Sequence, residues 1–167
     1  MKLYIVRHAI AASHGTPGLD DDERSLTEEG ITKMQQAAAG LRALEYIPDL
    51  IMTSPLVRAR QTAEILLKAL GKGVRMEILP ALAPSGSRED LYHALRLYDK
   101  KLESLMLVGH QPSLGEIAGE IAFGSSSHSI ELKKGGACVI DMESIQGTPK
   151  GVLLALLTPS ILRKIVV

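Results

Sequence analysis

The sequence predicts an α/β fold, a three-layer α/β/α sandwich around a mostly parallel central sheet. Short apolar runs typical of strands alternate along the chain with longer segments in which apolar residues recur at helical spacing. A unit of apolar run, polar turn and helix occurs three times before residue 122. Neighbouring parallel strands need crossover connections, so this alternation favours helices on both faces of one sheet.

The first unit consists of an expected strand at Leu3–Val6 and a helix that follows Thr27. Thr27 is a suitable N-cap, because Glu28 and Glu29 then occupy the first turn, where negative charge is favoured. Apolar residues recur after it at helical spacing and indicate a helix of about four turns. These residues are Ile31, Met34, Ala38, Leu41 and Leu44.

The second unit begins with the apolar run at residues 50–53, which predicts a short buried strand. A helix is expected to follow, with Pro55 as its first residue and Gly71 just beyond its end. Arg58 then lies in the first turn of this helix. A third strand is expected over residues 74–79.

Later segments continue the alternation. A helix is expected from Arg88 to about Lys100, then a strand at residues 105–108 and a helix from Pro112 to about Ile121. Two late strands are expected at residues 137–142 and 152–158, joined by a turn. We therefore expect five or six strands in a single domain over residues 1–167, whose 46% hydrophobic content suits one core.

Composition excludes several classes of partner. Lys and Arg total 19, as do Asp and Glu, so no net charge attracts the chain to nucleic acid or to an anionic membrane, and we expect neither as a partner. No apolar stretch approaches the roughly 20 residues of a membrane span, and the N-terminus resembles a strand rather than a signal peptide. The single cysteine, Cys138, has apolar neighbours and suits the core of a cytoplasmic protein.

Three of the expected strands end next to cationic or imidazole side chains. Arg7 and His8 follow the first strand, Arg58 lies just after the second, and His110 follows the strand at residues 105–108. In such sheets, ligands bind beyond the carboxyl ends of the strands. We therefore expect these four residues to share one site.

The chemistry of these side chains suits a phosphoryl group. Arg7 and Arg58 can hold a tetrahedral oxyanion with forked hydrogen bonds. His8, fixed beside Arg7, is the better candidate for a neutral imidazole that attacks phosphorus and forms a phosphohistidine, which water later cleaves. His110 would hydrogen-bond a phosphoryl oxygen in the transition state. Arg24 either reaches the phosphate from the loop after the first strand or is a solvated loop charge.

Other polar residues indicate no further chemistry. Ser54 is interpreted as a helix cap rather than a nucleophile, because no Gly-x-Ser-x-Gly motif surrounds it. His14, His93 and His128 share no metal-ligand spacing and are interpreted as structural or exposed. We expect no metal ion and no cofactor.

These residues lie in motifs that resemble those of the histidine phosphatase superfamily. Residues 6–9, Val-Arg-His-Ala, resemble its signature, in which the last position is commonly glycine. Residues 54–62 resemble its second motif, residues 107–110 its third, and residues 26–30 the start of its first helix. The resemblance spans nearly the whole chain and implies a phosphoglycerate mutase-like fold. It also implies that His8 is the phosphorylated nucleophile and that Arg7, Arg58 and His110 form the phosphate pocket.

Within the superfamily, the short length and residues 79–86 most resemble the SixA-type phosphohistidine phosphatases. Larger members usually carry a glutamate general acid in this loop, whereas residues 80–87 here contain no carboxylate. An alkoxide leaves poorly without an acid, but the nitrogen of a phosphohistidine can enter already protonated. Glu89, Asp90 and the run Asp20–Glu23 are alternative donors, for which a solvated charge is the simpler interpretation.

We therefore expect a metal-independent phosphatase in signal transduction that removes phosphate from phosphohistidine on a protein, such as a histidine-containing phosphocarrier. The chain has no residues to spare for a cap domain, which favours an open pocket that admits a protein surface. A phosphomonoesterase or mutase for a small phosphoester, such as a sugar phosphate or phosphoglycerate, is one alternative. A non-catalytic phosphate-sensing or phosphoprotein-binding module is a second.

Overall fold

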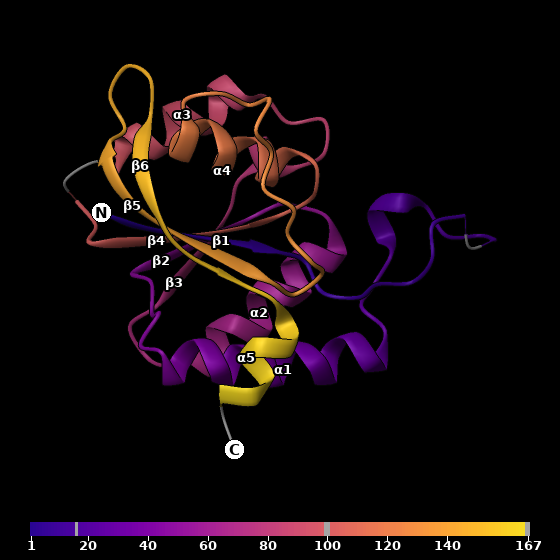
Figure 1. Ribbon diagram of the computed structural model, residues 1–167. Helices are drawn as coiled ribbons and strands as arrows, with labels where there is room; N and C mark the ends of the chain where they lie inside the picture. The colour runs from indigo at the N-terminus through magenta and orange to yellow at the C-terminus, as the bar shows by residue number, and fades with distance from the viewer. Residues whose placement is uncertain (16, 99–100, 166–167) are drawn as a thin grey trace.

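A computed structural model describes residues 1–15, 17–98 and 101–165 (Figure 1). Within these residues six strands form one sheet in the order β3-β2-β4-β1-β5-β6. The strands are β1 Lys2–Arg7, β2 Leu50–Thr53, β3 Arg75–Ile78, β4 Ser104–Gly109, β5 Ala137–Ser144 and β6 Lys150–Leu157. The first four are parallel, and β5 is antiparallel to both β1 and β6. The predicted mostly parallel sheet is confirmed.

The helices form a layer on each face of the sheet (Figure 1). They are α1 Glu28–Ala43, α2 Val57–Leu70, α3 Arg88–Leu97, α4 Ser113–Phe123 and α5 Pro159–Ile165, with short 3-10 turns η1 Asp21–Glu23 and η2 Pro80–Leu82. Helices α1, α2 and α5 share one core with the sheet, and α3 and α4 share the other. The described chain is thus the expected three-layer sandwich.

Strand β1 shows how one sequence serves both cores. Leu3 and Ile5 pack into the core under α3 and α4, whereas Tyr4 and Val6 pack into the core under α1 and α2. Each of the four is at most 3% exposed. Because successive side chains of a strand point to opposite faces, a strand buried on both sides is apolar throughout, as the run at Leu3–Val6 is.

Helix α1 lies unusually close to its neighbours at two glycines. A Cβ atom on Gly40 would overlap the carbonyl oxygen of Leu162 in α5, and one on Gly30 would overlap the carbonyl oxygen of Ile10. Both glycines are buried. They set which side of α1 faces inward, and this corrects the expected stripe: Met34 is 1% exposed, but Ile31 is 36% exposed.

Helix α2 begins at Val57, not at the predicted Pro55. Leu56 is extended, with φ −65° and ψ 140°, so the helix cannot include it. Its amide donates to the Ser54 hydroxyl oxygen at 3.3 Å. Ser54 therefore caps a turn that precedes the helix, and Arg58 still lies in the first helical turn.

Other boundaries differ by a few residues. Helix α3 ends at Leu97, earlier than expected, and Lys100 lies outside the described residues. Pro112 caps α4 instead of opening it. Helix α5 was not expected from its seven residues; Thr158 caps it by accepting a hydrogen bond from the Ile161 amide at 3.3 Å.

Cys138 lies in β5 and is fully buried, which confirms its place in the core. None of the helices in the described part of the chain is long and apolar enough to cross a bilayer.

The contact between α1 and α5 leads to a stability prediction. We expect Gly40→Ala to lower the free energy of unfolding by about 1–3 kcal/mol, because the added methyl group forces α5 away from α1. Urea denaturation measures the change. Gln36→Ala, at an exposed position of the same helix, is the matched control and should stay within about 0.5 kcal/mol of the parent. Equal stability of the two variants would contradict the role given to Gly40.

Candidate active site

A cavity of about 550 Å³ opens at the carboxyl ends of β1 and β4. In the register of these strands, Arg7 pairs with Gly109, so the next residues, His8 and His110, leave the sheet side by side. The His8 amide donates to the Gly109 carbonyl at 3.0 Å, and the two imidazole rings are 5.1 Å apart. The cavity is lined by Arg7, His8, Ala11, Ala12, Ser13, His14, Asp21, Arg24, Arg58, Pro84, His110, Gln111 and Lys134.

His8 is held in one tautomer. Its Nδ1 is 2.8 Å from the Ala9 carbonyl oxygen, and since a carbonyl can only accept, Nδ1 carries the proton. The Ala9 amide in turn donates to Thr62 Oγ1 at 3.0 Å, which ties this segment to α2. Nε2 therefore carries the free lone pair.

The two buried histidines of the cavity, His8 and His110, are neutral at pH 7. Burial lowers the pKa of His8 to about 4, and the charges of Arg58 and Arg7 act in the same direction. Burial also lowers the pKa of His110 to about 3. His8 is 7% exposed and His110 3%. The cavity thus holds two neutral imidazoles beside fixed positive charge.

His110 is oriented by the turn that precedes α2. Its Nε2 is 2.8 Å from the hydroxyl oxygen of Ser54, which is fully buried. Its Nδ1 is buried and has no hydrogen-bond partner within the described residues. Ser54 thus positions a cavity histidine in addition to capping its own turn.

Each of the two predicted phosphate-binding arginines is anchored by part of its guanidinium. Arg7 Nη1 donates to the Leu132 carbonyl at 2.8 Å. Arg58 Nη1 donates to the Asp21 carbonyl at 2.6 Å, and Nη2 to Asp21 Oδ2 at 3.1 Å. The Nε atoms of both arginines are buried without a partner in the described part of the chain. These N–H groups are available to donate hydrogen bonds to an anion.

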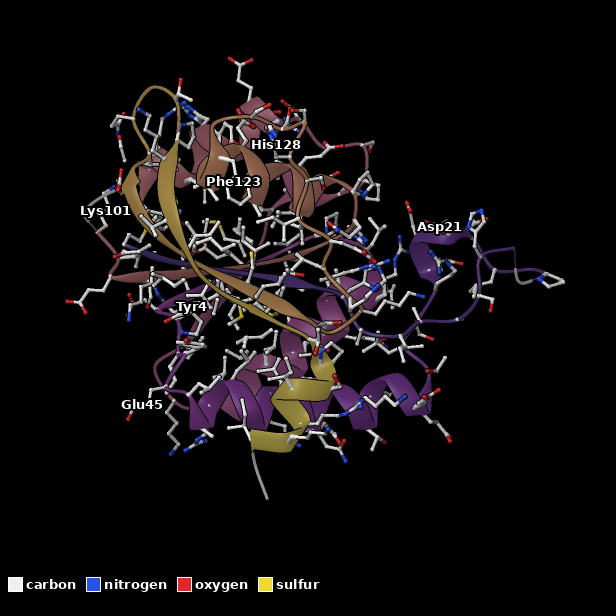
Figure 2. The ribbon with its side chains drawn as sticks, viewed as in Figure 1. Tyr4, Asp21, Glu45, Lys101, Phe123 and His128 are labelled. Carbon is white, nitrogen blue, oxygen red and sulfur yellow. The ribbon has the colours of Figure 1, made fainter. Side chains whose placement is uncertain are left out.

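The segment between β1 and α1 lines one side of the cavity, which sequence reasoning missed. The bridge between Ala11 and Leu26 closes its base, and η1 brings Asp21 to the end of the molecule where β1 finishes (Figure 2). Asp21 Oδ1 contacts Arg24 at 2.8 Å and His14 Nδ1 at 2.9 Å. Only the fold reveals this network, because in sequence Asp21 is one of four consecutive acidic residues.

The network decides the state of Asp21 and the place of Arg24. The hydrogen bond with His14, together with Arg24 and Arg58, lowers the pKa of Asp21 to about 2. Asp21 is therefore a carboxylate and a poor proton donor at neutral pH. Arg24 is not a solvated loop charge: it lines the cavity, and its Nη1 also donates to the Ala12 carbonyl at 2.8 Å.

The remaining candidates are distributed around the molecule. Glu89 and Asp90 lie in the first turn of α3 and do not line the cavity. His93 and His128 also lie outside it, whereas His14, expected to be structural or exposed, is 83% exposed and yet lines it. Among the described residues, Asp21 is the only carboxylate that lines the cavity, and no three His, Cys, Asp or Glu side chains are grouped to hold a metal ion.

Comparison with known proteins identifies the family of the chain. A model of the histidine phosphatase superfamily (branch 1) matches residues 3–86, half of the chain. An uncharacterised protein of Picosynechococcus sp. is 43% identical over 137 residues, which are 81% of this chain and 82% of that protein.

Two further comparisons concern SixA. Phosphohistidine phosphatase SixA of Escherichia coli K12 is 27% identical over 149 residues, 89% of this chain and 90% of that protein. A solved structure of the protein histidine phosphatase SixA complexed with tungstate superposes with a TM-score of 0.83, at 24% identity, over 96% of this chain and 98% of that one. The second comparison confirms the predicted fold class.

The buried histidines lead to a pH prediction. Unfolded His8 titrates near its ordinary pKa of about 6.5, but folded His8 titrates at about 4. The unfolded chain therefore binds more protons between these values, so His8 destabilises the fold as the pH falls from about 6.5 towards 4. At pH 4.5 the loss from this residue is about 2 kcal/mol.

Urea denaturation of the parent and of His8→Asn at pH 7 and pH 4.5 measures this effect. The variant cannot titrate at this position, so we expect it to lose about 2 kcal/mol less than the parent on acidification. Carboxylates titrate in both proteins and cancel in the difference. Parallel losses would show that His8 is not held neutral by burial.

Proposed function

The chain belongs to branch 1 of the histidine phosphatase superfamily, and on that premise we propose that it is a phosphatase whose nucleophile is Nε2 of His8. The observation that carries the proposal is the hydrogen bond from His8 Nδ1 to the Ala9 carbonyl. This bond leaves Nε2 unprotonated beside two arginines that have unpartnered Nε donors among the described residues. A phosphoryl group supplies the acceptors that these donors lack.

In the first step, Nε2 of His8 attacks phosphorus in line. The bond from phosphorus to the leaving atom breaks as the bond to Nε2 forms, and the bonding electron pair departs with the leaving group. Arg7, Arg58 and His110 bind the equatorial oxygens, where charge redistributes in the transition state. Asp21 holds the Arg58 guanidinium in place for this contact.

In the second step, water attacks phosphorus from the side that the leaving group has vacated. The bond between phosphorus and Nε2 breaks and returns its electron pair to Nε2. His8 leaves as a neutral imidazole, because Nδ1 keeps the proton that it donates to Ala9 throughout. The attacking water loses a proton to solvent or to the phosphate.

Phosphohistidine on a protein, such as a histidine-containing phosphocarrier, is the proposed substrate. An imidazole whose second nitrogen is already protonated leaves as a neutral molecule and needs no acid, whereas an alkoxide does. Among the described residues the cavity offers one carboxylate, Asp21, and the pKa of its carboxyl group is about 2. From the 80–87 loop only Pro84 lines the cavity. SixA is named as a phosphohistidine phosphatase, which supports the same substrate class.

Several finer points stay predictions. The chain is expected to work without a metal ion, as one domain and in the cytoplasm. A small phosphoester is the alternative substrate, and a binding module without turnover is the alternative to an enzyme.

Trapping the intermediate tests the covalent role of His8. We expect the parent, mixed with a ³²P-labelled phosphohistidine carrier and quenched in alkali, to retain label that acid releases, since phosphohistidine is acid-labile. His8→Ala should retain none.

Arg58→Ala keeps the nucleophile and serves as the comparison in the same experiment. It should still trap label, with kcat/KM lower by roughly 10²- to 10³-fold, by analogy with the loss of one oxyanion donor. If the parent binds phosphate but neither traps label nor turns over any phosphorylated substrate, the protein is a binding module.

A substrate panel tests the proposed class. With a chelator present throughout, we expect kcat/KM to be higher for a phosphohistidine carrier than for sugar phosphates and phosphoglycerate, because the latter release poor leaving groups into a cavity without an acid. Faster turnover of the esters would transfer the proposal to small phosphoesters. Loss of all activity on adding chelator would contradict metal independence.

A further inference from the structure

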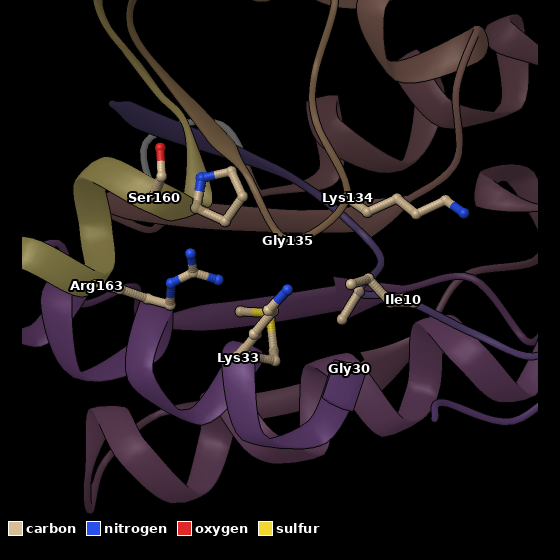
Figure 3. Close-up of a pocket in the computed structure, with 10 residues that line it drawn as sticks. Ile10, Gly30, Lys33, Lys134, Gly135, Ser160 and Arg163 are labelled. Atoms are coloured by element: carbon tan, nitrogen blue, oxygen red, sulfur yellow. The ribbon is translucent and has the colours of Figure 1, made fainter. Parts of the chain in front are cut away.

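A second cavity, of about 200 Å³, lies beside the chain that follows His8, at Ala9 and Ile10 (Figure 3). Helix α1 forms its floor, the start of α5 one side, and the chain before β5 the other (Figure 3). Its lining residues are Ala9, Ile10, Gly30, Lys33, Met34, Lys134, Gly135, Pro159, Ser160 and Arg163. The catalytic mechanism uses none of the cations in this set.

The charge of this cavity is positive. Lys33 extends from α1 and Arg163 from α5 towards the same space, whereas Lys134 lines the other side of the cavity with its ammonium group pointing away from both (Figure 3). No carboxylate lines the cavity among the described residues. Glu29, which does not line the cavity, pairs with Lys33, and the charge of Arg163 also acts on Glu29. Within the part of the chain that the structure describes, Arg163 and Lys134 form no ion pair of their own. In a chain with no net charge, this is a local concentration of cations.

The second cavity lies next to the catalytic cavity. Lys134 lines both of them. The Gly135 amide contacts the carbonyl oxygens of Arg7 at 3.1 Å and His8 at 3.2 Å, so the wall between the cavities is bonded to the backbone of the proposed nucleophile. The distance between an anion bound at Lys33 and Arg163 and a phosphoryl group at His8 is therefore set by the backbone.

The cavity suits a glutamate or aspartate side chain. Its cations would pair with a carboxylate, and Ile10, Met34 and Pro159 supply apolar surface for methylene groups. A volume of about 200 Å³ holds one or two side chains rather than a nucleotide. The neighbouring catalytic cavity would take the phosphoryl group of the same ligand.

We propose that the second cavity, through Lys33 and Arg163, binds an acidic segment of the phosphoprotein whose phosphohistidine enters the catalytic cavity. This inference rests on the proposed function for its substrate and adds the chemistry of the partner surface: carboxylates next to the phosphorylated histidine. Docking of this kind lowers KM and leaves kcat unchanged, because the contacts are the same in the ground state and the transition state.

Two phosphohistidine peptides of equal length test the proposal. One carries glutamates on both sides of the histidine, and the other carries glutamines. We expect KM of the parent to be about fivefold lower for the acidic peptide, the size expected of two exposed ion pairs, and the preference to shrink as salt rises. In the double variant Lys33→Gln/Arg163→Gln the preference should vanish, with kcat and the activity on the glutamine peptide unchanged.

The matched control removes the same charges elsewhere. Lys72→Gln/Arg75→Gln lies at the far edge of the sheet, at β3, and should keep the preference for the acidic peptide. A parent without preference, a Lys33/Arg163 variant that keeps it, or a control that loses it equally would each overturn the docking site.

A binding measurement separates this proposal from the proposed function. Fluorescence anisotropy with labelled, unphosphorylated versions of both peptides needs no turnover. We expect tighter binding of the acidic peptide by the parent and by the Lys72/Arg75 control, and equal binding of both peptides by the Lys33/Arg163 variant. If no phosphohistidine peptide is hydrolysed, the proposed function fails. The anisotropy measurement then tests the docking site by itself, because it needs no turnover.

Discussion

The parallel pairing of β1 with β4 is the constraint on which the site depends. Because Arg7 lies opposite Gly109, the two histidines that follow these strands emerge together, with ring centres 5.1 Å apart. A shift of the register by one residue would also exchange the two faces of β1 and turn Leu3 and Ile5 into the wrong core. The packing that stabilises the sheet therefore also fixes the distance between the residues proposed to act on phosphate.

Burial is the main cause of the lowered histidine pKa values at this junction. Desolvation and neighbouring arginines keep His8 neutral, and its bond to the Ala9 carbonyl decides which nitrogen is free. The arginines that disfavour an imidazolium are the same groups that would attract a phosphoryl group. Asp21 balances part of their charge, and since its own pKa is lowered by the same contacts, it acts as a fixed anion rather than an acid. The site combines a proposed nucleophile with a proposed anion pocket, and Asp21, the one carboxyl group among the described residues that line it, is ionised.

Lack of an acid and an open rim lead to the same class of substrate. A phosphorylated imidazole departs without help, and within the described residues no cap domain covers the cavity, so a protein can reach it. The cationic cavity next to it, which shares Lys134 in its lining, extends this reasoning from the reacting atoms to the surface around them. Recognition and chemistry would then be separated. The catalytic cavity would bind the phosphoryl group, and the second cavity would bind acidic residues of the substrate protein.

The sequence by itself determined the fold class, the strand order along the chain and the four residues at the strand ends. Runs such as Leu3–Val6 are apolar at every position, as expected of a strand that is buried on both faces. The four site residues are then predicted from the positions where such strands end: Arg7, His8, Arg58 and His110. Local signals were less decisive for the exact ends of helices. Pro55 is suited to a first helical position but also to a turn, and here it lies in a turn before α2 begins at Val57.

Only the tertiary structure decided the role of Asp21, the place of Arg24 and His14 in the cavity, and the cavity between α1 and α5. Each depends on contacts between segments distant in sequence. Asp21 binds Arg58, which is 37 residues further along the chain, and Gly40 in α1 packs against Leu162 in α5. Such contacts are set by how whole layers pack, and no local pattern of apolar and polar residues encodes them.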